Sequence, residues 1–208
     1  SAEGPPCSSV GVTCAVGRGE IKDSALGLTE VVWVGPESRG VYVGSPSIVH
    51  LRNGTALASH DFFGSRGTLN ATVQVLRDDS AHVSGPDSRW VYAGNVSGIY
   101  WANLFTLGAA ATATSGAEEV YLMGASFGDA QVGTYGRSIV ISRSVTAGRS
   151  WSKPSVLFAG GKLGTPGYRS YGCAPTPTIH GSDGRLYRNF AGRGGINIIM
   201  TRDPVTPA

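Results

Sequence analysis

Some side chains of this sequence have the chemistry for acid–base catalysis or for binding sugars and anions. Asp61 directly follows His60, so a carboxyl and an imidazole are neighbours in the chain. Tyr100 and Trp101 form an aromatic pair that could stack on a sugar ring. Arginine suits anionic ligands because its guanidinium can donate two parallel hydrogen bonds. The candidate site residues are Asp61, with its carboxyl, and, as binding residues, His60, Tyr100, Trp101, Asp129, Arg169, Tyr171 and Arg188.

Each candidate also has a structural alternative. Asp61 could cap the turn before Phe62-Phe63-Gly64 by accepting backbone hydrogen bonds. His60 could pack beneath the surface, and Tyr100-Trp101 could pack between layers of the fold. The arginines could form surface ion pairs.

The elements that must position these residues are short strands. Glycine is frequent (31 residues), charged residues are sparse (15%), and Val, Ile, Tyr, Trp and Thr recur in short runs separated by turn residues. Residues 44–51 and 55–60 read as strands joined by Asn53-Gly54, and the segments before and after Asp183-Gly184 follow the same plan. Both dipeptides predict a type I′ hairpin turn.

These strands belong to a degenerate repeat of about 65 residues. The turn markers Gly54, Gly116 and Gly184 are spaced regularly, and a further strand pair follows the first two hairpins, at 71–76 with 89–92 and at 138–142 with 155–158. Four antiparallel strands per unit are typical of a propeller blade. We therefore expect an all-β chain forming about three blades, at 40–95, 96–160 and 165–208, with an unassigned segment at 1–39. A β-sandwich of about twelve strands is the alternative.

The stretch Ser144-Val145-Thr146-Ala147-Gly148-Arg149-Ser150-Trp151 resembles the Asp-box, or BNR repeat, of the sialidase (neuraminidase) superfamily. Thr146 stands where that motif has Asp, and Gly148 suits the positive φ of its turn. The resemblance covers roughly residues 40 to 205. It implies part of a six-bladed propeller, with the Asp-box as a structural device.

The resemblance also implies a set of catalytic residues. Sialidases clamp the sugar carboxylate with three arginines and use one Asp as acid/base, with a Tyr assisted by Glu as the nucleophile. Asp61 falls near the place expected for the acid/base Asp, and Gly44 takes the place of the first clamp arginine. The Tyr nucleophile would lie in later blades. Strand directions predict that Val43 to Ser45, Asp61, Trp101 and the other candidates gather at one face of the propeller.

Composition narrows the possible partners. The net charge is only +3 and the basic residues are scattered, so nucleic acid is an unfavourable partner. No apolar run is long enough for a membrane span. Neither a metal site nor an organic cofactor is expected. The tripeptides beginning at Asn53, Asn70 and Asn95 fit N-glycosylation, and Cys7 and Cys14 could pair, which favours a secreted protein.

The sequence therefore predicts a secreted, exo-acting, sialidase-like glycoside hydrolase that acts on terminal sugars of glycans. A propeller that binds glycans or proteins without catalysis is the alternative, because the first clamp arginine is absent and the Asp-boxes are degraded. A lyase or another glycosidase specificity is also compatible with the fold. Oligomeric state is not determined by these patterns.

Overall fold

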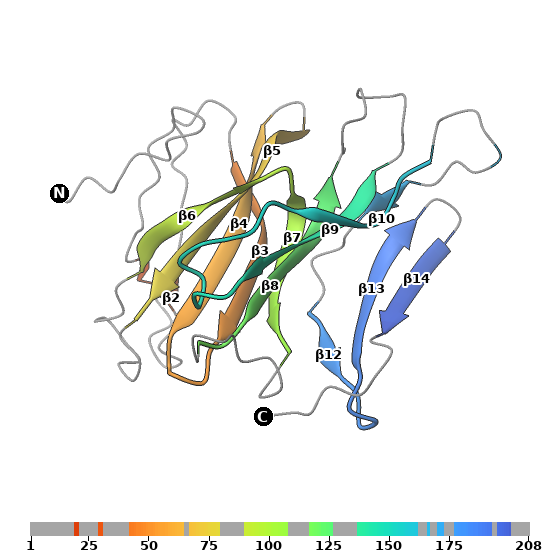
Figure 1. The fold of residues 1–208 in the computed structure, drawn as a ribbon. Helices are drawn as coiled ribbons and strands as arrows, with labels where there is room; N and C mark the ends of the chain where they lie inside the picture. Colours follow the sequence, from red (N-terminus) through yellow and green to blue (C-terminus); the bar gives the residue numbers. More distant parts are fainter. Residues whose placement is uncertain are drawn as a thin grey trace.

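The structure is a computed structural model that describes residues 19–20, 29–30, 42–64, 67–79, 90–107, 117–126, 137–161, 166, 170–172, 177–192 and 195–200. The elements in this part of the chain are all β-strands. A two-stranded sheet, β1 (Gly19–Glu20) with β2 (Thr29–Glu30), accompanies three four-stranded antiparallel sheets. Figure 1 shows these three larger sheets side by side in chain order.

The three larger sheets follow one another along the chain. Sheet 1 has the order β3 (Tyr42–His50), β4 (Ala56–Gly64), β5 (Gly67–Asp78), β6 (Val91–Ser97). Sheet 2 has the order β7 (Tyr100–Thr106), β8 (Val120–Ser126), β9 (Ser138–Ser144), β10 (Ser155–Phe158). In sheet 3, β13 (Leu186–Gly192) pairs with β11 (Tyr171–Gly172), β12 (Ile179–His180) and β14 (Gly195–Met200).

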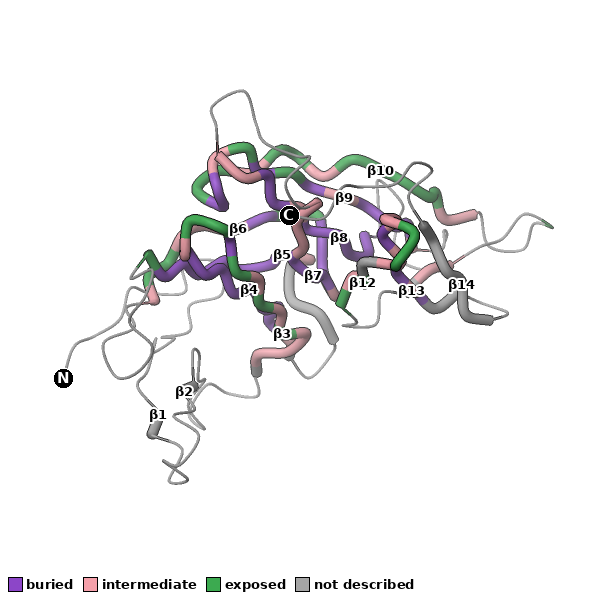
Figure 2. The backbone as a smooth tube through the Cα atoms, turned by 90° about the horizontal axis from the view of Figure 1, so that it is seen from below, coloured by how far each residue is buried: buried purple, intermediate pink, exposed green. Residues whose placement is uncertain are grey.

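Alternation along the strands explains why the sheets pack face to face. Side chains two residues apart point to the same face of a strand. One face of sheet 1 meets one face of sheet 2, and the other face of sheet 2 meets sheet 3. The first contact buries Leu57, Val73, Val75, Leu104, Leu122 and Val140, and the second buries Met123, Ile139 and Phe190. In Figure 2 the inner strands are mostly buried, whereas β10 is exposed along its length.

The prediction of type I′ hairpin turns is wrong in detail. Gly54 has φ 85° and Gly184 has φ 76°, but neither Asn53 nor Asp183 has a positive φ, and a type I′ turn needs two such residues. Instead the Leu51 and Gly181 amides bond the carbonyls four residues later, giving three-residue loops closed by a glycine. Asn53 Oδ1 accepts from Thr55 N at 3.0 Å and Asp183 Oδ1 from Arg185 N at 3.0 Å. These side chains thereby stabilise the turn without a left-handed backbone.

Two β-bulges occur at the same place in sheets 1 and 2. The register shifts between Gly44 and Ser47 in β3, and between Tyr100 and Asn103 in β7. Each bulge holds a non-glycine residue in the left-handed region, Ser45 and Trp101, both with φ 51°. Such strain costs on the order of 1–3 kcal/mol per residue and is often found at functional sites.

The turn after β9 has the hydrogen bonds that the Asp-box-like sequence predicts. Ser144 Oγ accepts from Gly148 N at 2.8 Å. Thr146 Oγ1 accepts from Ser150 N at 2.9 Å, so a hydroxyl makes the bond expected of a carboxylate. Gly148 has φ 84°, and a Cβ there would lie 2.6 Å from Leu57 Cδ1. The turn is therefore packed closely against sheet 1.

Candidate functional site

One end of the sheets gathers four of the candidate residues, Asp61, Tyr100, Trp101 and Tyr171. The strands β3, β7 and β9 begin there and β4 and β8 end there, because all pair antiparallel. We call it the Asp61 end, and the opposite end the hairpin end. In the three larger sheets the other described carboxylates lie at or near the hairpin end: Asp78, Asp79, Glu118, Glu119 and Asp183. Asp61 is thus the sole described carboxylate of these sheets at its own end.

Asp61 lies at the centre of this end and is almost completely buried, with 1% of its surface exposed. Its Oδ2 accepts a hydrogen bond from Trp101 N at 2.6 Å, and Ser45 also bonds the carboxylate. Oδ1 has no hydrogen-bond partner within the described residues. Burial outweighs these two bonds and raises the pKa of Asp61 to about 7. The carboxyl therefore keeps its proton over a range in which an ordinary aspartate is ionised.

Trp101 contacts both the Asp61 carboxyl and the Arg137 guanidinium. Its backbone N–H faces Asp61, while its ring carries the Arg137 guanidinium 4.7 Å from the ring centroid. This distance is within the range of a cation–π interaction. Arg137 N donates to Ser170 Oγ at 3.2 Å, and Arg137 O accepts from Tyr171 N at 3.1 Å. The Asp61 end is thus a connected series of groups contributed by all three sheets.

Tyr100 and Tyr171 pack beside these groups through their aromatic rings. The Tyr100 ring is 1% exposed and meets the Trp101 ring edge-on, with centroids 5.2 Å apart. Tyr171 is half-buried and meets Phe190 edge-on at 5.4 Å. As the structure stands, Trp101 and Tyr171 are the aromatic candidates with exposed surface.

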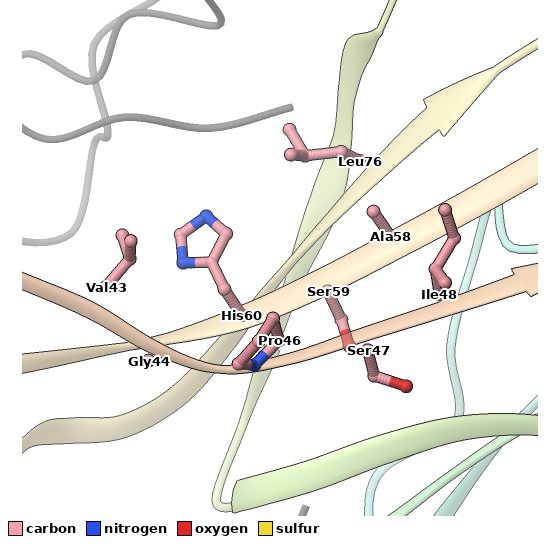
Figure 3. A pocket seen from close by; sticks show the side chains of 9 residues that line it. All are labelled: Val43, Gly44, Pro46, Ser47, Ile48, Ala58, Ser59, His60 and Leu76. Carbon is pink, nitrogen blue, oxygen red and sulfur yellow. The ribbon is translucent and has the colours of Figure 1, made fainter. Parts of the chain in front are cut away.

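His60 lies on the other face of sheet 1, because neighbouring residues of a strand point to opposite faces. Its Nε2 bonds Gln74 Oε1 at 2.9 Å, and burial lowers the pKa of the imidazole. Figure 3 shows the ring among the side chains that line a separate cavity, which are largely apolar and include Val43, Pro46 and Leu76. The volume of this cavity is about 570 Å³. The structure therefore does not bring His60 and Asp61 into one site.

Arg188 is not brought to Asp61 either. Arg188 is buried at 3% exposure between sheets 2 and 3, where its Nη2 donates to Asn103 Oδ1 at 2.6 Å and to Met123 O at 3.1 Å. These bonds join the two sheets. Asp129 and Arg169 lie outside the described residues.

Two residues of the Asp61 end, Ser45 and Arg137, were not singled out as site residues, although strand directions predict both at this face. Arg137 directly precedes the apolar strand Ser138–Ser144, and Ser45 directly precedes Pro46. Their positions at strand starts were visible in the sequence. Their contacts with Trp101 and Asp61 depend on the packing of one sheet against the next.

Two other features were searched for within the described residues. They contain no group of three or more His, Cys, Asp or Glu side chains that could hold a metal ion. They also contain no helix with the length and apolar character needed to span a membrane.

These features define an all-β protein of four-stranded antiparallel sheets, and its fold is similar to that of known glycosidases. An α-L-arabinofuranosidase of Fusarium graminearum superposes with a TM-score of 0.52 at 14% identity, over 76% of this chain and 44% of that one. An α-L-arabinanase of Penicillium chrysogenum, complexed with arabinobiose, gives 0.51 at 17% identity, over 78% and 45%. A Hadza microbial sialidase gives 0.44 at 16% identity, over 79% and 35%.

At these identities the likeness shows the fold alone, and the score for the sialidase is too low to support an argument. The chain spans less than half the length of the two fungal structures. No protein-family model and no curated protein sequence matches it.

Proposed function

We propose that this chain is part of a secreted glycoside hydrolase in which Asp61 is the general acid. The observation that carries the proposal is a buried carboxyl with a pKa of about 7 and an unpartnered Oδ1 at the shared end of three sheets. A protonated carboxyl near neutral pH can donate to a leaving oxygen, which glycoside hydrolysis requires. The second catalytic group would come from outside the described residues, and the sequence resemblance places it in later blades.

The internal repeat supports a functional role for Asp61. Gly44 pairs with Asp61 beside the bulge of sheet 1, and Tyr100 pairs with Ala125 beside the bulge of sheet 2. An alanine therefore holds the position of Asp61 in the second sheet. Because the sheet forms there without a carboxyl, the repeat itself does not require Asp61. A buried acid that the fold does not need is a functional-site candidate.

We further propose that the three sheets are consecutive blades of a six-bladed propeller, with blades at 40–95, 96–160 and 165–208. Supporting this, sheet 1 packs on sheet 2, and sheet 2 uses its opposite face for sheet 3. Repeating such a contact produces a ring. The glycosidases with this fold are more than twice as long as the aligned part of this chain.

The substrate we propose is a terminal sugar of a glycan. The sequence resemblance implies sialic acid, whose carboxylate needs an arginine clamp. At Gly44, where the first clamp arginine is expected, a Cβ would lie 2.7 Å from Phe63 Cε2. A side chain there would require the Phe63 ring to move, and the glycine that occupies the position supplies no guanidinium. The proposal therefore places a neutral sugar, such as the arabinosyl unit named for the fungal proteins, ahead of sialic acid.

A second candidate function is a propeller that binds glycans without cleaving them. The observation favouring it is the burial of Asp61 at 1% exposure, beside the half-buried Trp101 with Arg137 on its ring. In that case Asp61 would serve to hold the strained Trp101 backbone through its N–H.

The test is an assay of the full-length protein against fluorogenic glycosides, including an α-L-arabinofuranoside and an α-sialoside. Asp61→Asn keeps an acceptor for Trp101 N but cannot donate the catalytic proton. Loss of at least about 10²-fold in kcat, the lower range for a general acid, supports hydrolysis through Asp61. Asp79→Asn at the hairpin end is the matched control and should keep full activity. Absence of turnover with retained glycan binding supports the second function.

A further inference from the structure

A second hollow lies at the hairpin end of sheet 2, away from Asp61. It encloses about 550 Å³, within the range of small-molecule sites. Its position follows from the strand order, since β9 ends and β10 begins there. The side chains used in the argument are Tyr121, Arg143, Ser150, Trp151, Ser152 and Ser155. Apart from Ser150 and Trp151 in the Asp-box-like turn, none of them belongs to a feature already interpreted.

The cation of this hollow is held rigidly. Arg143 bonds Glu119 through two nitrogens, with Nε donating to Oε2 at 2.9 Å and Nη2 donating to Oε1. Tyr121 Oη donates to Glu119 Oε2 at 2.5 Å. The Glu119 side chain is 7% exposed, whereas that of Arg143 is 50% exposed. One buried carboxylate thus orients both an exposed guanidinium and a phenol.

The same pair sets the charge of the hollow. Arg143, as the largest influence, keeps the pKa of Glu119 below its usual range. Both groups therefore stay ionised at neutral pH, and their charges cancel. No described side chain lining the hollow adds a further charge. The hollow consequently favours an uncharged ligand.

The remaining lining side chains are two aromatic rings, three serine hydroxyls and the apolar side chains of Ile141 and Val145. Trp151 is fixed because its Nε1 donates to Gly148 O at 3.2 Å. Ser150, Ser152 and Ser155 are exposed around it. Aromatic rings bind the C–H faces of a sugar, and hydroxyls and a guanidinium bind its hydroxyl groups. The hydroxyls of Ser150 and Ser152 already bond Thr146 Oγ1 and Arg143 N, so a sugar would use the further hydrogen-bonding capacity of these hydroxyls.

We propose that this hollow, built by the Glu119–Arg143–Tyr121 network and Trp151, binds a neutral sugar unit as a site separate from the Asp61 end. It would hold a second part of a glycan while the Asp61 end contacts a terminus, and it does not depend on hydrolysis. Its ligand class is a neutral saccharide of one or two rings.

The experiment uses saturation-transfer NMR and calorimetry on the full-length protein. The probes are arabinobiose, lactose and cellobiose, with sialyllactose as the acidic comparison. Ser155→Tyr fills the hollow from an exposed strand position without altering the core. Val156→Tyr is the matched control, because the neighbouring residue points to the other face of β10 and is 55% exposed. The Asp61→Asn variant shows whether sugar binding at the hollow depends on the Asp61 end.

The expected result is binding of a neutral sugar that Ser155→Tyr weakens by about tenfold or more, whereas Val156→Tyr and Asp61→Asn leave it unchanged. Arg143→Gln should weaken it as well. Three results would overturn the inference: no neutral sugar bound by the wild-type protein, binding unaffected by Ser155→Tyr, or stronger binding of the acidic probe. Hydrolysis lost in Asp61→Asn with no effect of Ser155→Tyr would refute this site and leave the proposed function standing.

Discussion

Replacing Asp61 by asparagine should remove a strong pH dependence of stability. Burial raises the pKa of this carboxyl from 3.8 to about 7. Between these values the folded protein holds a proton that the unfolded chain has released, so stability falls as pH rises. The slope is about 1.4 kcal/mol per pH unit, which over roughly three units amounts to about 4 kcal/mol. This contribution is fully present below pH 3.8 and is lost as the pH rises through 7.

Urea unfolding at a series of pH values measures the effect. The side-chain amide of the Asp61→Asn variant cannot ionise, so the free energy of unfolding of this variant relative to wild type should rise by up to about 4 kcal/mol between about pH 4 and pH 8. The titration of His60, whose pKa burial lowers, is common to both proteins and cancels in the difference.

The Asp79→Asn variant is a control, because the contribution of Asp79 to the pH dependence of stability has the opposite sign. The hydrogen bond from Arg77, as the main cause, lowers the pKa of Asp79. Its contribution to stability is present at neutral pH and is lost as the pH falls through its folded-state pKa. A constant difference between Asp61→Asn and wild type over the same pH range would refute the reasoning, since Asp61 would then titrate as an ordinary aspartate.

Further measurements test the turn after β9 and the hairpin end. Gly148→Ala should lower the free energy of unfolding in urea by about 2–4 kcal/mol, because the strain of a side chain at φ 84° adds to overpacking against Leu57. Gly98→Ala should cost only about 1 kcal/mol, because Gly98 has the same φ but open space around its Cβ position. Thr146→Asp should preserve stability, because the new carboxylate can accept the hydrogen bond from Ser150 N. Thr146→Val removes this acceptor and should lower the free energy of unfolding by about 1 kcal/mol. Equal stability of the two variants would contradict the role of that bond. Expressed in a eukaryotic secretory host, the protein should carry a glycan on Asn53, which is exposed in a turn, but not on Asn95, whose Oδ1 is buried in β6. The mass lost on enzymatic deglycosylation, compared between the wild type and the Asn53→Gln and Asn95→Gln variants, shows which asparagine carries the glycan.

Local sequence patterns predicted most of the strands. The runs at 71–76 and 138–142 lie within β5 and β9, and Gly54 and Gly184 close the β3–β4 and β12–β13 hairpins. These elements depend on side-chain period and glycine conformation, which act over a few residues. The turn after β9 was indicated by Gly148 and the short polar residues around it, whereas the hydrogen bond from Ser150 N to the Thr146 hydroxyl was not predicted.

The relations between sheets were decided by tertiary structure. Asp61 and His60 are adjacent in sequence, yet one faces Trp101 of the next sheet and the other a separate cavity. Arg137 reaches Trp101, and Arg188 joins two sheets, through contacts between residues 36 and 85 positions apart. Composition alone fixes neither the strand face on which a residue falls nor the sheet that covers it. The sequence by itself therefore determined the strands and the candidate acid, whereas packing of one sheet on another decided its burial, its raised pKa and its neighbours.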